Sequence, residues 1–584
     1  MRRFIVGLLA TVGTLTLLAA GAAVAFVMSA PFATAPLPKS MVLSLDLRSM
    51  PGETAASELF GLWQDSPDII ETARALWRAA DDPRVSGIFV EVGDDSAGLA
   101  RVQELRDAFV RLRAKGKFAV GFAEGLGQSG EHFADYYLAS ALDQIWLQPS
   151  GTFAVAGIAV ETPFLKQGLD RLGIRAEGGK RQEYKSAPDS FTETGHSAAT
   201  RQNLQRLLDS LYGRFIEDVA RERKIEPARL RQLIDAAPFS AERARSEGLI
   251  DRVGYRADAM EAMWQRAGKD RELVALEDYA AEKQDPPGGA PVLALVRVSG
   301  AITSGTSSAS PLDDESAATS DDVVEAIELA SRNRSVKAIV LRIDSPGGTY
   351  PAADAIADAV RRARALGKPV VVSMGDVAAS GGYLAAVRAD AIVAQPTTIT
   401  GSIGVFGLWP VAADLLTSLG VNVERLQAGA NAGLYSMFQS PTPTQRAAIG
   451  RDLDAVYADF TRQVGEARNL DAGRLDAAAR GRIFSGSDAR QAGLVDELGG
   501  LQAAIDIAKA RANIEPAQAV ELRRFPREGA RWERLAERLQ RMVGVNARGP
   551  HLRAPREVRE AMARLGIAAH PGNVRLPPLP PLWK

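Results

Sequence analysis

The strongest constraint on the fold of this chain is an internal repeat. Three segments recur after 247 residues (395 − 148 = 247), namely Gln148-Pro149 as Gln395-Pro396, Gly157 as Gly404, and Leu172-Gly173 as Leu419-Gly420. Phe239-Ser240 recurs as Phe484-Ser485 after 245 residues (484 − 239 = 245). Small insertions in loops explain such a difference in offset. The chain is therefore expected to contain two related domains.

The two copies are predicted to cover residues 40–285 and 290–512. Between them lies Gln284-Asp-Pro-Pro-Gly-Gly-Ala-Pro291, whose composition is typical of a linker. Residues 513–584 form an Arg- and Pro-rich tail that ends in the polyproline-like segment Leu576–Trp583. We expect this tail to pack or dock, and we assign it no chemistry.

Each copy alternates β-branched runs with amphipathic segments. Strands are predicted at Val292–Val298, Lys337–Ile343, Pro369–Ser373, Gly87–Val92 and Phe118–Phe122, and helices at Asp354–Leu366 and Leu99–Lys115. Alternating strands and helices predict an α/β fold with largely parallel strands.

The N-terminal residues 1–30 are predicted to anchor the chain in a membrane. Arg2 and Arg3 precede an uncharged apolar run from Phe4 to Met28, which is long enough to cross a bilayer as a helix. The two arginines should stay on the cytoplasmic side and direct the remainder across the membrane. A cleaved signal peptide is the alternative, although its apolar core is usually shorter.

Composition excludes several kinds of catalysis. The chain has no Cys, so thiol nucleophiles, disulfides and Cys-ligated metals are excluded. Its four His stand in no metal-ligand pattern and beside no candidate nucleophile, which disfavours a Ser-His-Asp triad. A formal net charge of −1 gives no electrostatic reason to expect a nucleic-acid partner. No cofactor or metal is predicted.

The candidate nucleophile is Ser380, in Gly375-Asp-Val-Ala-Ala-Ser-Gly-Gly-Tyr383. A Ser among small residues at a strand-to-helix junction can present its hydroxyl at the helix N-terminus, where the dipole favours developing negative charge. Alternatively, Ser380 only caps the helix. The first copy has Phe133 at the corresponding position (380 − 247 = 133), so only the second copy can carry the nucleophile.

A serine nucleophile needs a base, and the second copy contains no His and no Lys between Lys368 and Lys509. The first copy supplies Lys185, in Tyr184-Lys-Ser-Ala187. A lysine can act as base if burial or nearby positive charge lowers its pKa, and Arg181 is a candidate for such a charge. Alternatively, Lys185 is an ordinary solvated surface lysine.

Two further segments complete the candidate site. Gly347 and Gly348, in Asp344-Ser-Pro-Gly-Gly348, together with Gly381, offer backbone N–H groups for an oxyanion hole. A simple tight turn is the alternative, but aligning Ile88 with Ile339 puts Ser96 and Ala97 where the glycines Gly347 and Gly348 stand. Ser402, in Thr400-Gly-Ser-Ile-Gly-Val405, is a candidate to orient the lysine amine or a plain turn residue.

Together these four motifs resemble the long, duplicated form of the signal peptide peptidase A family, over about residues 40–512. The resemblance implies two tandem domains with a Clp protease- and crotonase-like fold of ββα spiral units. It also implies a Ser–Lys dyad of Ser380 and Lys185, supported by Ser402, with Gly347 or Gly348 and Gly381 donating to the oxyanion. Pro188 departs from the family pattern just after the lysine motif, which puts the local backbone path in doubt.

The resemblance further implies a homotetramer on the periplasmic side of the bacterial inner membrane that degrades remnant signal peptides. Two alternatives remain at the level of sequence. A crotonase-like enzyme acting on acyl-CoA would also use Gly-rich strand ends, but would not need Ser380. A catalytically silent membrane scaffold would use both copies only for assembly.

Overall fold

The structure is a computed structural model and describes residues 36–53, 67–93, 98–128, 133–282, 289–306 and 317–526. The predicted anchor at Phe4–Met28, the positions Ser96 and Ala97, most of the predicted linker and the tail from residue 527 lie outside the described residues. No helix among the residues described is long and apolar enough to span a membrane.

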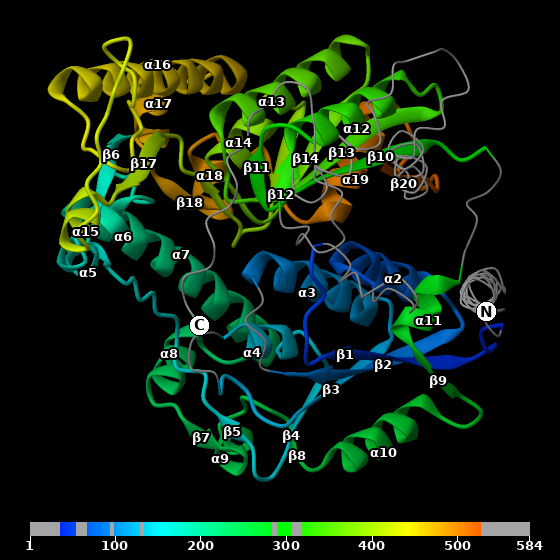
Figure 1. Cartoon of the computed structure of the whole chain (residues 1–584). Helices are drawn as coiled ribbons and strands as arrows, with labels where there is room; N and C mark the ends of the chain where they lie inside the picture. Colours follow the sequence, from blue (N-terminus) through cyan, green and yellow to red (C-terminus); the bar gives the residue numbers. More distant parts are fainter. Residues whose placement is uncertain are drawn as a thin grey trace, which may run out of the picture. The chain divides into compact units, whose positions relative to one another are not determined.

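The first sheet is built from residues 41–275, with strand order β8-β4-β3-β2-β1-β9 and parallel pairing throughout. Its strands are β1 (Met41–Leu47), β2 (Val85–Val92), β3 (Phe118–Ala123), β4 (Gln144–Leu147), β8 (Arg252–Val253) and β9 (Glu272–Ala275). In Figure 1, α2 (Ile69–Asp81) and α3 (Leu99–Ala114) cover the face that points to the second sheet, and α10 (Arg256–Ala267) covers the other.

The second sheet has the core order β18-β16-β14-β13-β10-β20, with β15 and β19 joined through β14. Its strands are β10 (Val292–Ser299), β13 (Val336–Ser345), β14 (Val370–Ala379), β15 (Ala391–Ala394), β16 (Ile399–Gly401), β18 (Ile483–Ser485), β19 (Glu497–Leu498) and β20 (Glu521–Phe525). All of its pairs are parallel except β16 with β18. β20 pairs with β10, so this sheet continues beyond residue 512, where the sequence predicts the copy to end.

Buried β-branched residues explain why these segments form central strands. Val336–Ser345, for example, is buried at eight of ten positions, as a strand covered on both faces by helices requires. The predicted strands and helices of both copies are confirmed to within a few residues, although β14 runs on to Ala379, well beyond its predicted end at Ser373.

The remaining elements connect and cover the sheets. They are β5 (Thr152–Phe153), β6 (Arg175–Arg181), β7 (Phe239–Ser240), β11 (Ala301–Thr303), β12 (Ala317–Thr319), β17 (Val405–Val411), α4 (Ala134–Ala139), α5 (Lys166–Arg171), α6 (Asp189–Thr192), α7 (Ala198–Arg223), α8 (Pro227–Asp235), α9 (Ala241–Ser246), α11 (Leu276–Ala281), α12 (Ser320–Arg332), α13 (Tyr350–Ala365), α14 (Gly381–Ala386), α15 (Ala413–Ser418), α16 (Pro443–Arg468), α17 (Ala472–Ala478), α18 (Gly486–Gln491) and α19 (Leu501–Arg511).

The predicted duplication is visible element by element. Helix α15 begins 247 residues after α5 (413 − 166 = 247), and α16 begins 245 residues after α7 (443 − 198 = 245). Both long helices start at a hydroxyl N-cap and end at a left-handed residue, Lys224 in one and Asn469 in the other. Phe133 and Ser380 are the N-cap residues of α4 and α14, so the repeat places them at corresponding points of the fold.

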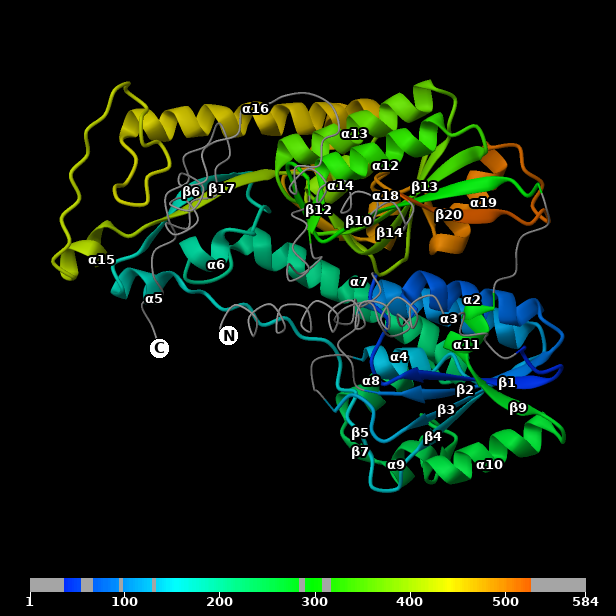
Figure 2. The same ribbon diagram turned by 45° about the vertical axis from the view of Figure 1, so that its right-hand side comes forward.

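Strand pairing, hydrogen bonds and ion pairs join the two copies. Strand β6 of the first copy pairs antiparallel with β17 of the second, and Figure 2 shows the two strands side by side, with α5 and α15 at their far end. The side-chain amide of Asn203, on α7, both donates to and accepts from the backbone of Ile483. Arg342, at 1% exposure, makes 2.6 Å ion pairs with Glu53 and Glu104 of the first copy.

Candidate active site

Ser380 lies where β14 ends and α14 begins. Its backbone has φ 55° and ψ −119°, a region that residues with a side chain rarely adopt and that recurs at functional sites. The Ser380 hydroxyl makes no capping hydrogen bond to α14. The alternative that this serine merely caps the helix therefore does not describe its geometry.

Lys185 comes from the loop between β6 and α6, and its Nζ atom reaches Ser380 Oγ at 2.9 Å. The same Nζ lies 2.9 Å from Ser402 Oγ and 3.0 Å from the Ser402 carbonyl oxygen. The structure thus brings together three side chains that the sequence predicts to cooperate, although Lys185 and Ser380 are 195 residues apart. Pro188 becomes the N-cap of α6 and leaves this arrangement intact.

Burial controls the protonation of Lys185. The residue is only 3% exposed, so it is not the solvated surface lysine of the alternative interpretation. Desolvation of the ammonium lowers the pKa of Lys185 from 10.5 to about 8. The three hydrogen-bond partners of the amine are neutral groups, which do not reverse this effect.

Arg181 does not help to lower this pKa, contrary to the expectation from its proximity in sequence. Its guanidinium group points to α16, where it pairs with Asp454 and donates to the Gly450 carbonyl oxygen. Burial is the cause of the shift at Lys185.

Two glycines that the sequence reasoning did not single out as site residues create the space for Lys185. A Cβ atom on Gly481, whose φ is +83°, would lie 2.5 Å from the Lys185 backbone nitrogen. A Cβ atom on Gly404 would lie 3.2 Å from the Lys185 side chain. The repeat of Gly157 as Gly404 was a sequence signal for Gly404. Its role at the site, however, depends on its close approach to Lys185 of the other copy, which the sequence does not show. Phe406 adds an aromatic ring with its centroid 6.0 Å from Lys185 Nζ.

The predicted oxyanion donors differ in whether their N–H group already has a hydrogen-bond partner. The Gly347 N–H donates to Ser345 Oγ at 3.1 Å, so it is already engaged. Across the described segments, the N–H groups of Gly348 and Gly381 have no hydrogen-bond partner. These two lie close together, since a Cβ atom on Gly381 would be 3.0 Å from the Gly348 nitrogen. Gly348 and Gly381 are therefore the pair suited to an oxyanion, with Gly347 shaping the turn.

Gly347→Ala should lower kcat by about 10²- to 10³-fold, because the added Cβ atom would crowd the Gly381 N–H and so remove one oxyanion donor. Gly347 has φ +106°, and its added Cβ atom would lie 2.7 Å from the Gly381 nitrogen and 2.9 Å from Ser380 Cβ. Steady-state kinetics on a peptide, the substrate that the resemblance implies, measures the effect. Gly367→Ala is the matched control, because Gly367 has φ +77° with nothing within 4 Å. If both variants lose activity equally, backbone strain alone explains the result.

The described residues contain no cluster of His, Asp and Glu that could hold a metal ion. The arrangement itself offers a hydroxyl, an amine of lowered pKa and two neighbouring N–H donors. Such a set can activate an alcohol as nucleophile toward a carbonyl carbon and stabilise the negative charge that forms.

Comparison with known proteins places this chain among peptidases. The model of peptidase family S49 matches residues 111–270 and 362–515, and the model of Clp protease matches residues 309–398. The chloroplastic serine protease SPPA of Arabidopsis thaliana is 30% identical over 485 residues, 82% of this chain and 70% of that protein. Protease 4 of Haemophilus influenzae is 30% identical over 467 residues, 76% of this chain and 73% of that protein.

A shorter relative matches part of the chain. The putative signal peptide peptidase SppA of Enterococcus faecium is 31% identical over 189 residues, 32% of this chain and 55% of that protein. The S49 match falls once in each copy, which agrees with a duplicated, Clp protease-like α/β domain.

Proposed function

The chain belongs to peptidase family S49 and is a serine protease, and from this premise we propose that Ser380 and Lys185 form its catalytic dyad. The observation that carries the proposal is the 2.9 Å approach of Lys185 Nζ to Ser380 Oγ. A buried amine whose pKa is lowered to about 8 is partly neutral near physiological pH and can accept a proton.

In the first half of the reaction, the neutral Lys185 amine accepts the hydroxyl proton of Ser380. The Ser380 oxygen attacks the carbonyl carbon of the peptide bond at the same time. The N–H groups of Gly348 and Gly381 donate to the oxyanion that forms. The Lys185 ammonium then gives its proton to the leaving amine, the peptide C–N bond breaks, and the acyl group remains on Ser380.

In the second half, water replaces the leaving amine. Lys185 takes a proton from the water as it attacks the acyl carbon, and returns that proton to the Ser380 oxygen when the ester bond breaks. Ser402 supports the lysine in both halves, because its hydroxyl and carbonyl oxygen contact Nζ and fix the direction of the amine. Ser402 is thus a positioning residue in this scheme.

The pH dependence of kcat/KM tests this assignment on the full chain in detergent, with a fluorogenic, N-blocked apolar peptide. Because only the neutral amine can accept a proton, kcat/KM should rise about tenfold per pH unit below pH 8 and level off above it. Burial raises the pKa of Asp344 to about 6. Any titration of this carboxyl would therefore appear in the profile about two pH units below that of Lys185. A profile that is flat between pH 6 and pH 9 would rule out Lys185 as the base.

Apolar peptides, including signal peptides released from preproteins, are the substrates we propose. One relative is named a putative signal peptide peptidase, which supports this class. The aromatic ring of Phe406 lies beside the dyad and is 42% exposed, so it can contact an apolar substrate side chain. The apolar run Phe4–Met28, retained as an anchor in the bacterial inner membrane, would keep the peptidase on the periplasmic side, close to such substrates.

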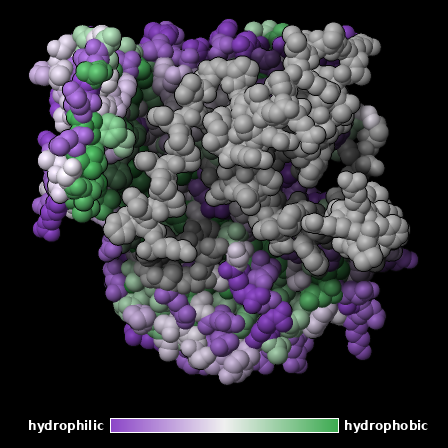
Figure 3. All heavy atoms as spheres, viewed as in Figure 1, coloured by the Kyte–Doolittle hydropathy of each residue, from purple (hydrophilic) through white to green (hydrophobic). Residues whose placement is uncertain are grey.

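We propose that the chain assembles with copies of itself, as a tetramer by analogy with the long signal peptide peptidase A form. An exposed apolar surface supports assembly, and Figure 3 shows apolar residues gathered over the α5 and α15 region. These residues are Leu165, Leu172, Leu419, Val421, Val423, Leu426, Tyr435, Met437 and Phe438, each between 44% and 92% exposed except Val423, which is 40% exposed. Sedimentation velocity of the full chain in detergent measures the number of subunits.

A further inference from the structure

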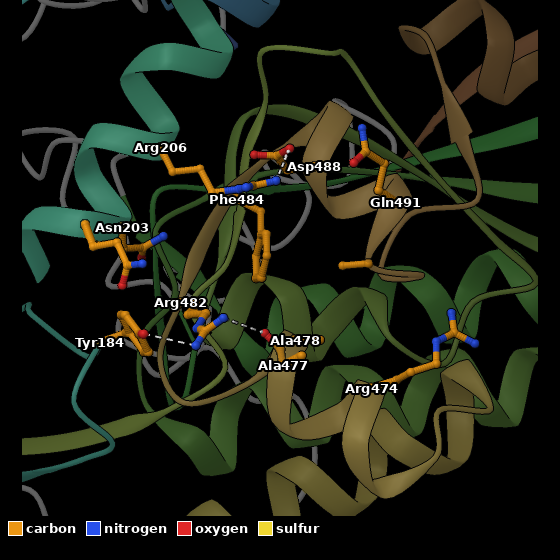
Figure 4. A pocket seen from close by; sticks show the side chains of 12 residues that line it. Tyr184, Asn203, Arg206, Arg474, Ala477, Ala478, Arg482, Phe484, Asp488 and Gln491 are labelled. Carbon is orange, nitrogen blue, oxygen red and sulfur yellow. Dashed lines mark hydrogen bonds and ion pairs between the residues drawn. The ribbon is translucent and has the colours of Figure 1, made fainter. Parts of the chain in front are cut away.

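A cavity lies beside the loop that carries the lysine, with Tyr184 in its lining. It has a volume of about 460 Å³ and lies between α7 of the first copy and α17, β18 and α18 of the second. Figure 4 shows its lining residues from close by. Its volume is within the range of small-molecule sites, about 300–1,000 Å³. The dyad atoms Lys185 Nζ and Ser380 Oγ do not line it.

The lining of this cavity carries more positive than negative charge. Arg206 pairs with Asp488 at 3.1 Å, so these two charges offset each other. Among the described residues, the Arg482 guanidinium has only neutral partners, the Tyr184 hydroxyl at 3.0 Å and the Ala477 carbonyl oxygen at 3.4 Å. Throughout the part of the chain that the structure describes, the Arg474 guanidinium has no hydrogen bond or ion pair. Two guanidinium charges are thus left without a carboxylate.

The same cavity has an apolar wall. The ring of Phe484 points into it from β18, and Ala477 and Ala478 line it from α17. Guanidinium groups bind carboxylates through paired N–H donors, and an aromatic ring offers contact to an apolar body. The combination fits a molecule with one carboxylate and one apolar side chain.

We propose that this cavity binds an apolar carboxylate, with the carboxylate held by Arg482 and the apolar part against Phe484. Peptide hydrolysis releases such molecules, since each cut creates a new carboxyl terminus. That source rests on the proposed function, whereas the binding itself does not.

Two residues that line the cavity, Tyr184 and Arg482, also adjoin or contact the residues of the candidate active site. Tyr184 directly precedes Lys185, and the Arg482 carbonyl oxygen accepts the Ser402 N–H at 2.6 Å. A carboxylate that draws Arg482 away from Tyr184 therefore acts on residues that hold Lys185 and Ser402. The cavity is thus connected to the dyad through Tyr184 and Arg482, although its ligand takes no part in the reaction.

Binding is tested by isothermal titration calorimetry with N-acetyl-phenylalanine on the full-length Ser380→Ala protein in detergent, so that the result does not depend on turnover. N-acetyl-phenylalanine amide is the control ligand, because it lacks only the charge. We expect the acid to bind at one site per chain and the amide at least about tenfold more weakly, the effect of losing a charged hydrogen bond.

Variants locate the site. Arg482→Gln should weaken binding of the acid at least about tenfold, because it removes the charge that holds the carboxylate. Arg474 is exposed and lies on the opposite side of the cavity, so Arg474→Gln should leave this binding unchanged. Arg490→Gln is the matched control, since Arg490 lies on α18 but does not line the cavity. Equal binding of acid and amide, undiminished binding to Arg482→Gln, or no binding at millimolar concentration would each overturn the proposal. Loss of peptidase activity in the wild type would instead count against the proposed function alone.

Discussion

Ser380→Ala should lower peptide hydrolysis by at least about 10⁴-fold, the scale on which removal of a nucleophile acts in serine peptidases. The hydroxyl has no capping role in α14, so its loss should leave the fold unchanged. Covalent labelling by a fluorophosphonate probe, located by mass spectrometry of the labelled peptide, gives a second measurement on the wild type. The label should fall on Ser380 and be absent from the variant.

Ser240→Ala is the control for this variant. Its hydroxyl accepts the Arg243 N–H as the N-cap of α9, in an exposed position of the first copy. Its removal should reduce the free energy of unfolding by about 1 kcal/mol and leave hydrolysis intact. Retention of hydrolysis in Ser380→Ala, with labelling of another serine, would show that the nucleophile is misassigned.

Lys185→Met should abolish hydrolysis to a similar extent and make the protein more stable at neutral pH. The pKa of Lys185 is about 8 in the folded chain and 10.5 as a free side chain, so the unfolded chain binds more protons between these values. Below pH 8 both states hold the proton, and the folded state bears the full penalty of burying the ammonium. This penalty is about 3 kcal/mol at most, and it disappears as the pH rises through 10.5. Denaturant unfolding at pH 7 measures the gain.

Lys368→Met is the matched control for the lysine. Lys368 donates to the carbonyl oxygens of Asn333 and Val336, at the opposite end of β14 from Ser380. This variant should keep its activity and lose stability, the reverse of Lys185→Met. Because the dyad acts as a unit, Ser380→Ala with Lys185→Met should hydrolyse no more slowly than either single variant. Additive losses in the double variant would show that the two residues act independently.

The duplication allowed most of the fold to be predicted from the sequence. The offsets of 247 and 245 residues return in the starting points of α5, α15, α7 and α16. The continuation of the second sheet was not predictable in this way. Strand β20 consists of Glu521-Leu-Arg-Arg-Phe525, whose charges give no alternating apolar pattern, and its position is set by pairing with β10.

The candidate site was predictable in its residues and less so in its details. Small residues around Ser380 and the absence of other bases pointed to Ser380 and Lys185. Arg181 was expected near the amine, but a salt bridge across to α16 determines its direction. Gly347 and Gly348 looked equivalent in the motif, and only the hydrogen bond from Gly347 to Ser345 distinguishes them. The direction of Arg181 depends on a contact between segments far apart in the chain, and the choice between the glycines depends on a local side-chain hydrogen bond.

The antiparallel pairing of β6 with β17 has a consequence for the synthesis of the protein. A ribosome makes Lys185 first, and β17 begins at residue 405, after Ser380. A growing chain that ends before this strand lacks the pairing that brings the loop of Lys185 to Ser380. Because the two halves must meet before the amine can reach the hydroxyl, the nascent polypeptide cannot bring Lys185 to Ser380 in this way before β17 has been made. The order of translation thus sets the earliest point at which the pair can form.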